Sequence, residues 1–254
     1  MAAADSTKRF SNRVEDYARY RPGYPQAILE PLREECGLAP ECRIADVGSG
    51  TGLLSRVFLD DGETVYGIEP NAEMRAAGER SLRGYPRFHS VAATAEATTL
   101  ADASVDFVVA GQAFHWFDAP AARREFARIL RPDGWAAILW NERLMDTTEF
   151  LRAYEALLRK YSTDYREVAA KYPGHREMKD FFAPGELRNR HFPNEQVFDF
   201  EGLGGRLLSS SYAPALGHPH HEPMLAELRR IFDVHNQDGL VRFEYATQLY
   251  YGRL

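Results

Sequence analysis

Three glycines at alternate positions mark the stretch of this chain whose residue types could do chemistry. Gly48, Gly50 and Gly52 follow the short segment 44–47, which is apolar except for Asp46. Apolar residues at helical spacing continue from Leu53, so the order strand, glycine turn, helix is predicted. Such a turn lets the backbone come close to a ligand, and the helix behind it presents unpaired N–H groups. The pattern is typical of a nucleotide site in an α/β sheet.

The position of the third glycine separates two kinds of cofactor. A dinucleotide-binding turn reads G-x-G-x-x-G and would place its third glycine at Leu53. This chain instead has Asp46-x-Gly48-x-Gly50-x-Gly52, with an acid before the first glycine. That pattern resembles motif I of the class I methyltransferases, which use S-adenosylmethionine. The resemblance implies that Gly48 and Gly50 line the methionine part of the cofactor and that Asp46 lies close to it. The alternative is a glycine-rich turn that binds nothing.

A second acid follows at the spacing that a nucleotide site requires. Residues 64–68 read as a strand that ends at Glu69. In nucleotide-binding α/β folds an acid about 20 residues beyond the glycine turn binds ribose hydroxyls. Glu69 is therefore predicted to bind ribose, although exposed acids at strand ends are common. Asn71 is expected to cap the next helix.

Polar and aromatic residues also follow the most apolar strand. Residues 105–110 are apolar except for Asp106, as suits a parallel strand buried on both faces. Gln112, His115 and Trp116 come directly after it, at the edge where open α/β sheets hold their ligands. Gln112 and Trp116 are predicted to contact cofactor or substrate. A histidine between aromatic residues is more often a packed residue than a catalyst, so both interpretations of His115 stay open.

Further strands and helices must position these residues. Strands are predicted at 44–47, 64–68, 87–91, 105–110 and 135–140, the last after a turn at 132–134. Helices are predicted after Pro25, after the glycine turn, after Asn71 and after Asp118. Pro31 implies a kink or break in the first of them, and Leu130 is placed on the apolar face of the last.

The pattern changes in the second half of the chain. A helix is expected from Asp146, and a short one at 178–182. A strand is expected over 191–200, a helix around 224–232 with Pro223 in its first turn, and an alternating strand over 240–251. These pieces suit an antiparallel pair at the sheet edge and a helical cap. The expected fold class is therefore α/β: a doubly wound, mostly parallel, seven-stranded Rossmann-like sheet with a helical cap.

The length of 254 residues suits a single domain with a buried core. We expect four parts: an N-terminal lid with helices (1–40), a cofactor-binding core (41–145), cap insertions with the sixth strand (146–217), and a last helix with the C-terminal antiparallel strand (218–254). The formal charge of −6 argues against a nucleic-acid binder. No apolar run suits a membrane span or a signal peptide. A cytoplasmic protein is expected, with Cys36 and Cys42 reduced.

Two further segments invite a functional interpretation. Residues 8–24 are rich in aromatic and basic side chains at helical spacing, and they are either a helix packed on the domain or a lid. In a lid, Tyr20, Arg21 and Tyr24 would face the ligand. The histidine-rich segment 218–222 is interpreted as a helix entry, because neighbouring histidines beside a proline rarely aim at one ion. No metal is expected.

Five segments together resemble one group of the class I methyltransferases, the trans-aconitate methyltransferase-like group. They cover residues 17–25, 46–52, 67–71, 112–117 and 209–212. The resemblance implies S-adenosylmethionine as cofactor and a small-molecule acceptor. A monomer or weak homodimer is expected. The residues expected to bind the cofactor are Asp46, Gly48, Ser49, Gly50, Gly52, Glu69, Pro70, Met74, Ala95, Glu96 and Gln112. Those expected to bind the substrate are Tyr20, Tyr24, Trp116 and Trp140.

Two mechanisms stay open for the methyl transfer. A carboxylate acceptor is already ionised at neutral pH and needs only cations to bind it, for which Arg21 and Arg143 are the candidates. An alcohol or phenol must lose its proton, and His115 is the side chain best suited to take it. Two other functions compete: a nicotinamide-dependent oxidoreductase of similar fold, and a catalytically silent protein that binds S-adenosylmethionine.

Overall fold

A seven-stranded sheet forms the centre of the protein. The computed structural model describes residues 14, 19–169 and 175–254. The strand order is β3-β2-β1-β4-β5-β7-β6. The first five strands run parallel, and β7 is antiparallel to both β5 and β6. The predicted fold class, with its antiparallel edge pair, is confirmed. The bounds are β1 Arg43–Val47, β2 Thr64–Ile68, β3 Phe88–Val91, β4 Val105–Gly111, β5 Leu130–Arg143, β6 Leu187–Phe198 and β7 Val241–Gly252.

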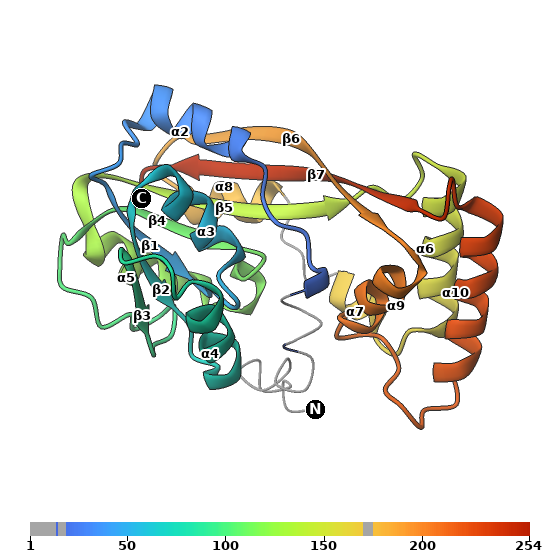
Figure 1. Ribbon diagram of the computed structural model, residues 1–254. Coiled ribbons are helices and arrows are strands. Elements are labelled where there is room, and N and C mark those ends of the chain that lie inside the picture. The colour runs from blue at the N-terminus through green and yellow to red at the C-terminus, as the bar shows by residue number, and fades with distance from the viewer. Residues whose placement is uncertain (1–13, 15–18, 170–174) are drawn as a thin grey trace.

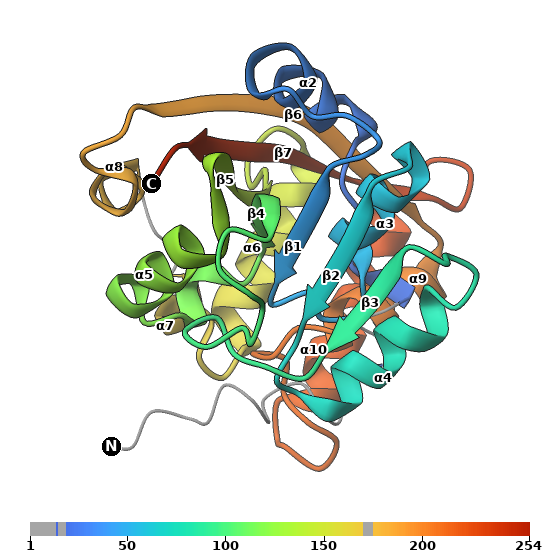
Figure 2. The ribbon, with the colours of Figure 1, turned by 90° about the vertical axis from the view of Figure 1, so that its left-hand side faces the viewer.

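Both faces of the parallel part are buried, because alternate residues of each strand enter different cores. Phe107 and Val109 of β4 pack in one cluster, and Val108 and Ala110 in the other. Helices α2 and α3 supply side chains to the first cluster, and α5 and α8 to the second. This two-sided burial explains the apolar run at residues 107–110 of β4. Figure 2 shows α3 and α5 on opposite sides of the sheet.

The helices begin at the polar residues that cap them. Asn71, Asp118 and Thr148 each accept a hydrogen bond from a backbone N–H of the first turn, as does Asp199. The α-helices are α2 Leu29–Cys36, α3 Leu53–Asp61, α4 Ala72–Ser81, α5 Ala119–Ile129, α6 Glu149–Tyr161, α7 Tyr165–Ala169, α8 His175–Phe182, α9 Phe200–Leu208 and α10 His221–His235. Short 3₁₀ turns cover Gln26–Ile28 (η1) and Phe114–Trp116 (η2). Within the described part of the chain, no helix has the length and apolarity that a membrane crossing requires.

A helical cap stands beside the sheet. Helices α6, α9 and α10 pack with one end of β7 around Phe243. Strands β6 and β7 are long enough to reach from the parallel core into this cap (Figure 1). The cap therefore faces the carboxyl ends of the parallel strands, where α3 and α4 begin.

Several local expectations need correction. Pro31 causes no break, because it lies in the first turn of α2, where its missing N–H needs no partner. Leu130 belongs to β5 and not to the preceding helix. The predicted turn at 132–134 is an irregularity inside β5, where the register to β4 jumps between Leu130 and Trp135. Helix α9 was not predicted, and most of the predicted N-terminal helix lies outside the described residues.

Candidate active site

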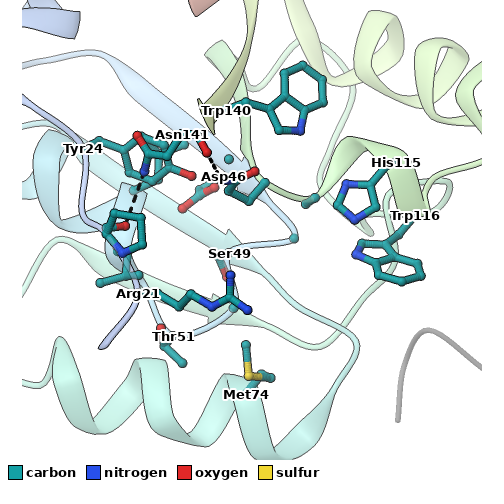
Figure 3. A pocket seen from close by; sticks show the side chains of 18 of the residues that line it. Arg21, Tyr24, Asp46, Ser49, Thr51, Met74, His115, Trp116, Trp140 and Asn141 are labelled. Atoms are coloured by element: carbon teal, nitrogen blue, oxygen red, sulfur yellow. Dashed lines mark hydrogen bonds between the residues drawn. The ribbon is translucent and has the colours of Figure 1, made fainter. Parts of the chain in front are cut away.

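A cavity of about 610 Å³ lies between the parallel core and the cap. Its volume is in the usual range for small-molecule sites. Residues at the ends of β1, β2, β4 and β5 form one wall (Figure 3). The cap residues Tyr165, Arg206, Ser211, Tyr212 and Tyr245 form the other. The predicted site residues that line it are Arg21, Tyr24, Asp46, Gly48, Ser49, Gly50, Glu69, Pro70, Met74, Ala95, Glu96, Gln112, His115, Trp116, Trp140 and Arg143.

Two predicted site residues do not line the cavity. Gly52 is the N-cap residue of α3 and has φ +84°, and a Cβ there would lie 2.6 Å from the Leu82 side chain. Gly52 therefore allows the glycine turn to pack against Leu82 and does not face the cavity. Tyr20 was expected to face the substrate, but its ring packs on Gly205 in the core of the cap. A side chain buried on that side cannot reach a ligand. The lid interpretation is therefore wrong for Tyr20, whereas most of its helical part lies outside the described residues.

The glycine turn is tied to the end of β2. The N–H groups of Gly48 and Ser49 donate to the carbonyl oxygen of Ile68, at 2.8 and 3.1 Å. The N–H of Gly50 donates to Oε2 of Glu69 at 3.0 Å. Gly48 and Gly50 have φ of +71° and +56°, a backbone conformation that L side chains rarely adopt. The turn beside the cavity therefore requires glycine at both positions.

Glu69 has acceptor capacity left for a ligand. Its Oε1 accepts from the N–H of Asn71 at 2.8 Å and its Oε2 from Gly50, while an ionised carboxylate has about four acceptor sites. The side chain is 8 % exposed, and burial raises its pKa above the ordinary value. Two hydroxyl groups of a ribose fit this remaining capacity.

We expect Glu69→Ala to weaken binding of S-adenosylhomocysteine by about 1–3 kcal/mol, because the ribose donors would lose their acceptor. Isothermal titration calorimetry measures this directly. Glu73→Ala removes an exposed acid that does not line the cavity, and it should bind like the wild type. Equal affinities of the two variants would reject the ribose assignment.

Asp46 is a fully buried acid that lines the cavity. Its Oδ2 accepts from the Ser55 hydroxyl at 2.6 Å, and its Oδ1 has no partner within the described residues. Burial raises the pKa of Asp46 to about 7. A cationic group beside it, such as the ammonium of a methionine moiety, would stabilise the ionised form.

This raised pKa predicts a pH dependence of cofactor binding. Below pH 7 Asp46 is largely neutral and offers little attraction to an ammonium, whereas above pH 7 it is an anion. The affinity for S-adenosylhomocysteine should therefore rise by up to about tenfold from pH 6 to pH 8. In Asp46→Asn, titrations at the same pH values should show a flat profile. A slope retained in this variant would assign the dependence to another group.

Residues 20–24 are held across the cavity by side chains of the sheet. Asn141 and Asn194 donate to the carbonyl oxygen of Gly23 at 3.0 and 2.9 Å, and Gln196 donates to that of Tyr20. The Thr247 hydroxyl donates to Oδ1 of Asn141 at 2.6 Å. This network anchors the described part of the predicted lid, and it leaves Arg21 and Tyr24 in the cavity wall (Figure 3).

The segment after β4 forms a third side of the cavity. Gln112 has φ +57°, unusual for a residue other than glycine, and its Nε2 donates to the Asn141 carbonyl at 3.1 Å. Its buried Oε1 has no partner among the described residues. The rings of His115 and Trp116 lie 4.7 Å apart on the side of the cavity opposite Arg21 and Met74 (Figure 3). All three side chains can therefore contact a ligand.

The cap wall carries arginines and hydroxyl groups. Arg143 donates through Nη2 to Glu155 and to the Tyr165 hydroxyl, and its buried Nη1 has no partner among the described residues. Arg206 lines the same wall with Tyr212 and Tyr245. Sequence reasoning missed Asn141 and Arg206. Asn141 directly follows the predicted fifth strand and could have been found by the rule that found Gln112, whereas Arg206 lies on the unpredicted α9.

Metal ligands do not gather anywhere in the described residues: no group of three His, Cys, Asp or Glu side chains there could hold an ion. The ring nitrogens of His220 and His221 bond to different carbonyls, those of Tyr161 and Pro214.

Comparisons with known proteins agree with this geometry. Residues 45–138 match the methyltransferase domain family. An uncharacterised methyltransferase-like protein of Schizosaccharomyces pombe is 29% identical over 237 residues, which cover 91% of this chain and 88% of that protein. A structure from Anaeromyxobacter dehalogenans, provisionally assigned as a type II methyltransferase, is 24% identical at a TM-score of 0.68, over 92% of this chain and 98% of that one.

A solved methyltransferase of known ligands has the same fold. Phosphoethanolamine N-methyltransferase 2 of Haemonchus contortus, in complex with phosphomonomethylethanolamine and S-adenosylhomocysteine, is 14% identical at a TM-score of 0.54. The match covers 98% of this chain and 58% of that one.

The fold, the glycine turn and these matches define the class: the chain is a class I S-adenosylmethionine-dependent methyltransferase. S-adenosylmethionine is its cofactor, and the nicotinamide alternative is set aside. The finer resemblance to the trans-aconitate methyltransferase-like group stays a prediction.

Proposed function

We propose that this enzyme methylates a carboxylate of a small acceptor held between the parallel core and the cap. One observation carries the proposal: the cavity has acids on its core wall and arginines on its cap wall. Asp46 and Glu69 lie at the glycine turn, and Arg143 lies opposite with a buried Nη1 that has no partner among the residues described. The acids suit the cationic cofactor, and the arginines suit an anionic acceptor.

The proposed division of the chain follows from the two walls. Residues 41–145 supply the cofactor side and also Arg143, which ends β5 and reaches the acceptor side. Residues 146–217 supply Tyr165, Arg206, Ser211 and Tyr212 of the acceptor side. Small-molecule acceptors fit the enclosed volume of about 610 Å³ better than a folded protein or nucleic acid.

The reaction requires no proton transfer with this acceptor. Held at the glycine turn by Asp46 and Glu69, S-adenosylmethionine would supply the methyl group and would leave as the neutral thioether S-adenosylhomocysteine. A carboxylate oxygen of the acceptor would take the methyl group as the bond from the methyl carbon to sulfur breaks. The acceptor becomes a neutral methyl ester. The protein orients the two reactants and excludes water, which weakens the hydration of the nucleophile.

Release of S-adenosylhomocysteine with a panel of small carboxylates, phenols, alcohols and amines tests the proposal. The product of a carboxylate should lose its methyl group as methanol in mild base, since esters hydrolyse there and methyl ethers and amines do not. A base-stable product, or turnover confined to phenols and alcohols, would contradict it.

A second mechanism is supported by His115, which stands in the cavity wall beside Trp116. For a phenol or alcohol, this side chain would take the proton that the acceptor loses. A loss of kcat of about a hundredfold or more in His115→Asn, within the range for removal of a general base, would favour this mechanism over the carboxylate one.

A further inference from the structure

Arg206 on α9 is a buried cation whose partners are neutral. Its side chain lines the cavity although the residue is only 5 % exposed. Its Nε donates to the Tyr245 hydroxyl and its Nη1 to the Ser210 hydroxyl, each at 3.2 Å. The Phe243 ring lies 5.9 Å from the guanidinium carbon. In the described part of the chain, no carboxylate forms an ion pair with Arg206.

The contrast with Arg143 is a difference in net charge. Arg143 lies in the same cap wall but forms an ion pair with Glu155, and both side chains are about one-tenth exposed. Glu155 also pairs with Arg159, but that side chain is 59% exposed and its charge is screened by solvent. The carboxylate therefore offsets the buried charge of Arg143, while hydroxyl groups cannot offset that of Arg206. Burying a guanidinium without a counter-charge is unfavourable, and an arginine stays protonated in proteins. A bound anion would supply the missing charge.

The surroundings of Arg206 suit an anion rather than a hydrophobic group. Arg21 donates to the carbonyl oxygen of Ser209 at 3.0 Å, so Arg21 and Arg206 contact the two ends of the Ser209–Ser210 pair. Ser211, Tyr212 and Tyr245 line the cavity beside them. Figure 1 shows α9 on the cap side, opposite α3 and α4. The first turns of α3 and α4 line the cavity beside the glycine turn, on the cofactor side. The cation therefore lies at the acceptor end.

The chemistry of the transfer decides which anion Arg206 can hold. The reacting carboxylate loses its negative charge as the methyl group arrives, so a full positive charge on it would stabilise the reactant more than the transition state. Arg143, whose charge Glu155 offsets, can orient the reacting carboxylate without this cost. An anionic group that takes no part in the reaction keeps its charge, and binding it to Arg206 costs nothing in the transition state.

We propose that Arg206 is a specificity-determining residue that binds a second, non-reacting carboxylate of the acceptor. This inference rests on the proposed carboxylate acceptor. A single carboxylate matches the single uncompensated charge of Arg206 better than a phosphate monoester does, because that group carries close to two negative charges at pH 7.

The test compares dicarboxylates with monocarboxylates of equal chain length, such as succinate with butyrate and glutarate with pentanoate. Two measurements are made on the enzyme saturated with S-adenosylhomocysteine or S-adenosylmethionine: the thermal shift on adding the acid, and kcat/KM for methyl transfer. The wild type should favour the dicarboxylates by about 10–100-fold in affinity and in kcat/KM, the range for one charge-assisted hydrogen bond. Arg206→Met should lose this preference and keep the monocarboxylate response. Arg206→Lys, which keeps the cation, should retain part of the preference.

The other outcomes reject one proposal or the other. If Arg206→Met weakens both kinds of acid equally, or keeps the dicarboxylate preference, Arg206 is a structural residue and this inference fails while the carboxylate acceptor stands. If the wild type neither binds nor methylates any carboxylate, the proposed function itself fails. If 3-phosphonopropionate, in which a phosphonate replaces the second carboxylate of succinate, binds more tightly than succinate and does so only with Arg206 present, the bound group is a phosphate-like dianion and the carboxylate assignment fails.

A measurement without any acceptor separates the same two roles. An uncompensated buried charge destabilises the ligand-free protein, so Arg206→Met should melt about 2–4 °C higher than the wild type. A lower melting temperature would show that the hydrogen bonds to Tyr245 and Ser210 are structural, and would overturn the inference.

Discussion

Gly50→Val should reduce the affinity for S-adenosylmethionine and S-adenosylhomocysteine by about a hundredfold or more. Gly50 has φ +56°, which strains any β-branched residue, and a Cβ there already lies 3.2 Å from Cε of Met74 in the cavity wall. The two methyl groups of valine would fill space beside the glycine turn. A shifted turn would also lose the hydrogen bond from the Gly50 N–H to Glu69.

Calorimetric titration of the folded variant measures the effect. Gly84→Val is the matched control, because a Cβ at Gly84 meets nothing within 4 Å and its φ is not positive. It should bind the cofactor like the wild type. Tight binding by a Gly50→Val protein that melts normally would contradict the assignment of this turn to the cofactor.

Arg143→Met should lower kcat/KM for a carboxylate acceptor by about 10–100-fold and leave the affinity for S-adenosylhomocysteine unchanged. The variant loses the buried Nη1 donor that is proposed to bind the acceptor. Among the described residues, the side-chain hydrogen-bond partners of Arg143 are Glu155 and Tyr165, and neither belongs to the glycine turn. The measurement is steady-state methyl transfer with the carboxylate that the panel identifies.

Arg159→Met is the matched control for Arg143. Both arginines pair with Glu155, but Arg159 is 59% exposed and does not line the cavity. Loss of the Glu155 ion pair alone would affect both variants alike. If Arg159→Met slows methyl transfer as much as Arg143→Met does, the effect is structural and Arg143 does not bind the acceptor.

The cofactor half of the site could be predicted from short stretches of sequence. The glycine spacing, the acid at the end of β2 and the Asn71 cap depend on residues close together in the chain, where turn chemistry and hydrophobic periodicity decide the structure. Pro31 and residues 132–134 were misjudged for a related reason. Proline and glycine disturb a helix or strand only at certain positions within it, and the sequence did not show that Pro31 lies in a first turn or that β5 continues through 132–134.

The acceptor half depended on contacts between distant parts of the chain. Asn141 reaches Gly23 across 118 residues, and Gln196 reaches Tyr20 across 176. These contacts exist because β7 inserts between β5 and β6 and carries the cap against the ends of the parallel strands. The sequence by itself therefore determined the fold class and the cofactor, through local patterns. Only the tertiary structure decided that Tyr20 packs in the cap, that Glu155 offsets the charge of Arg143, and that Arg206 lines the cavity with neutral partners. The reason is that burial and charge pairing depend on which distant segments the strand order brings together.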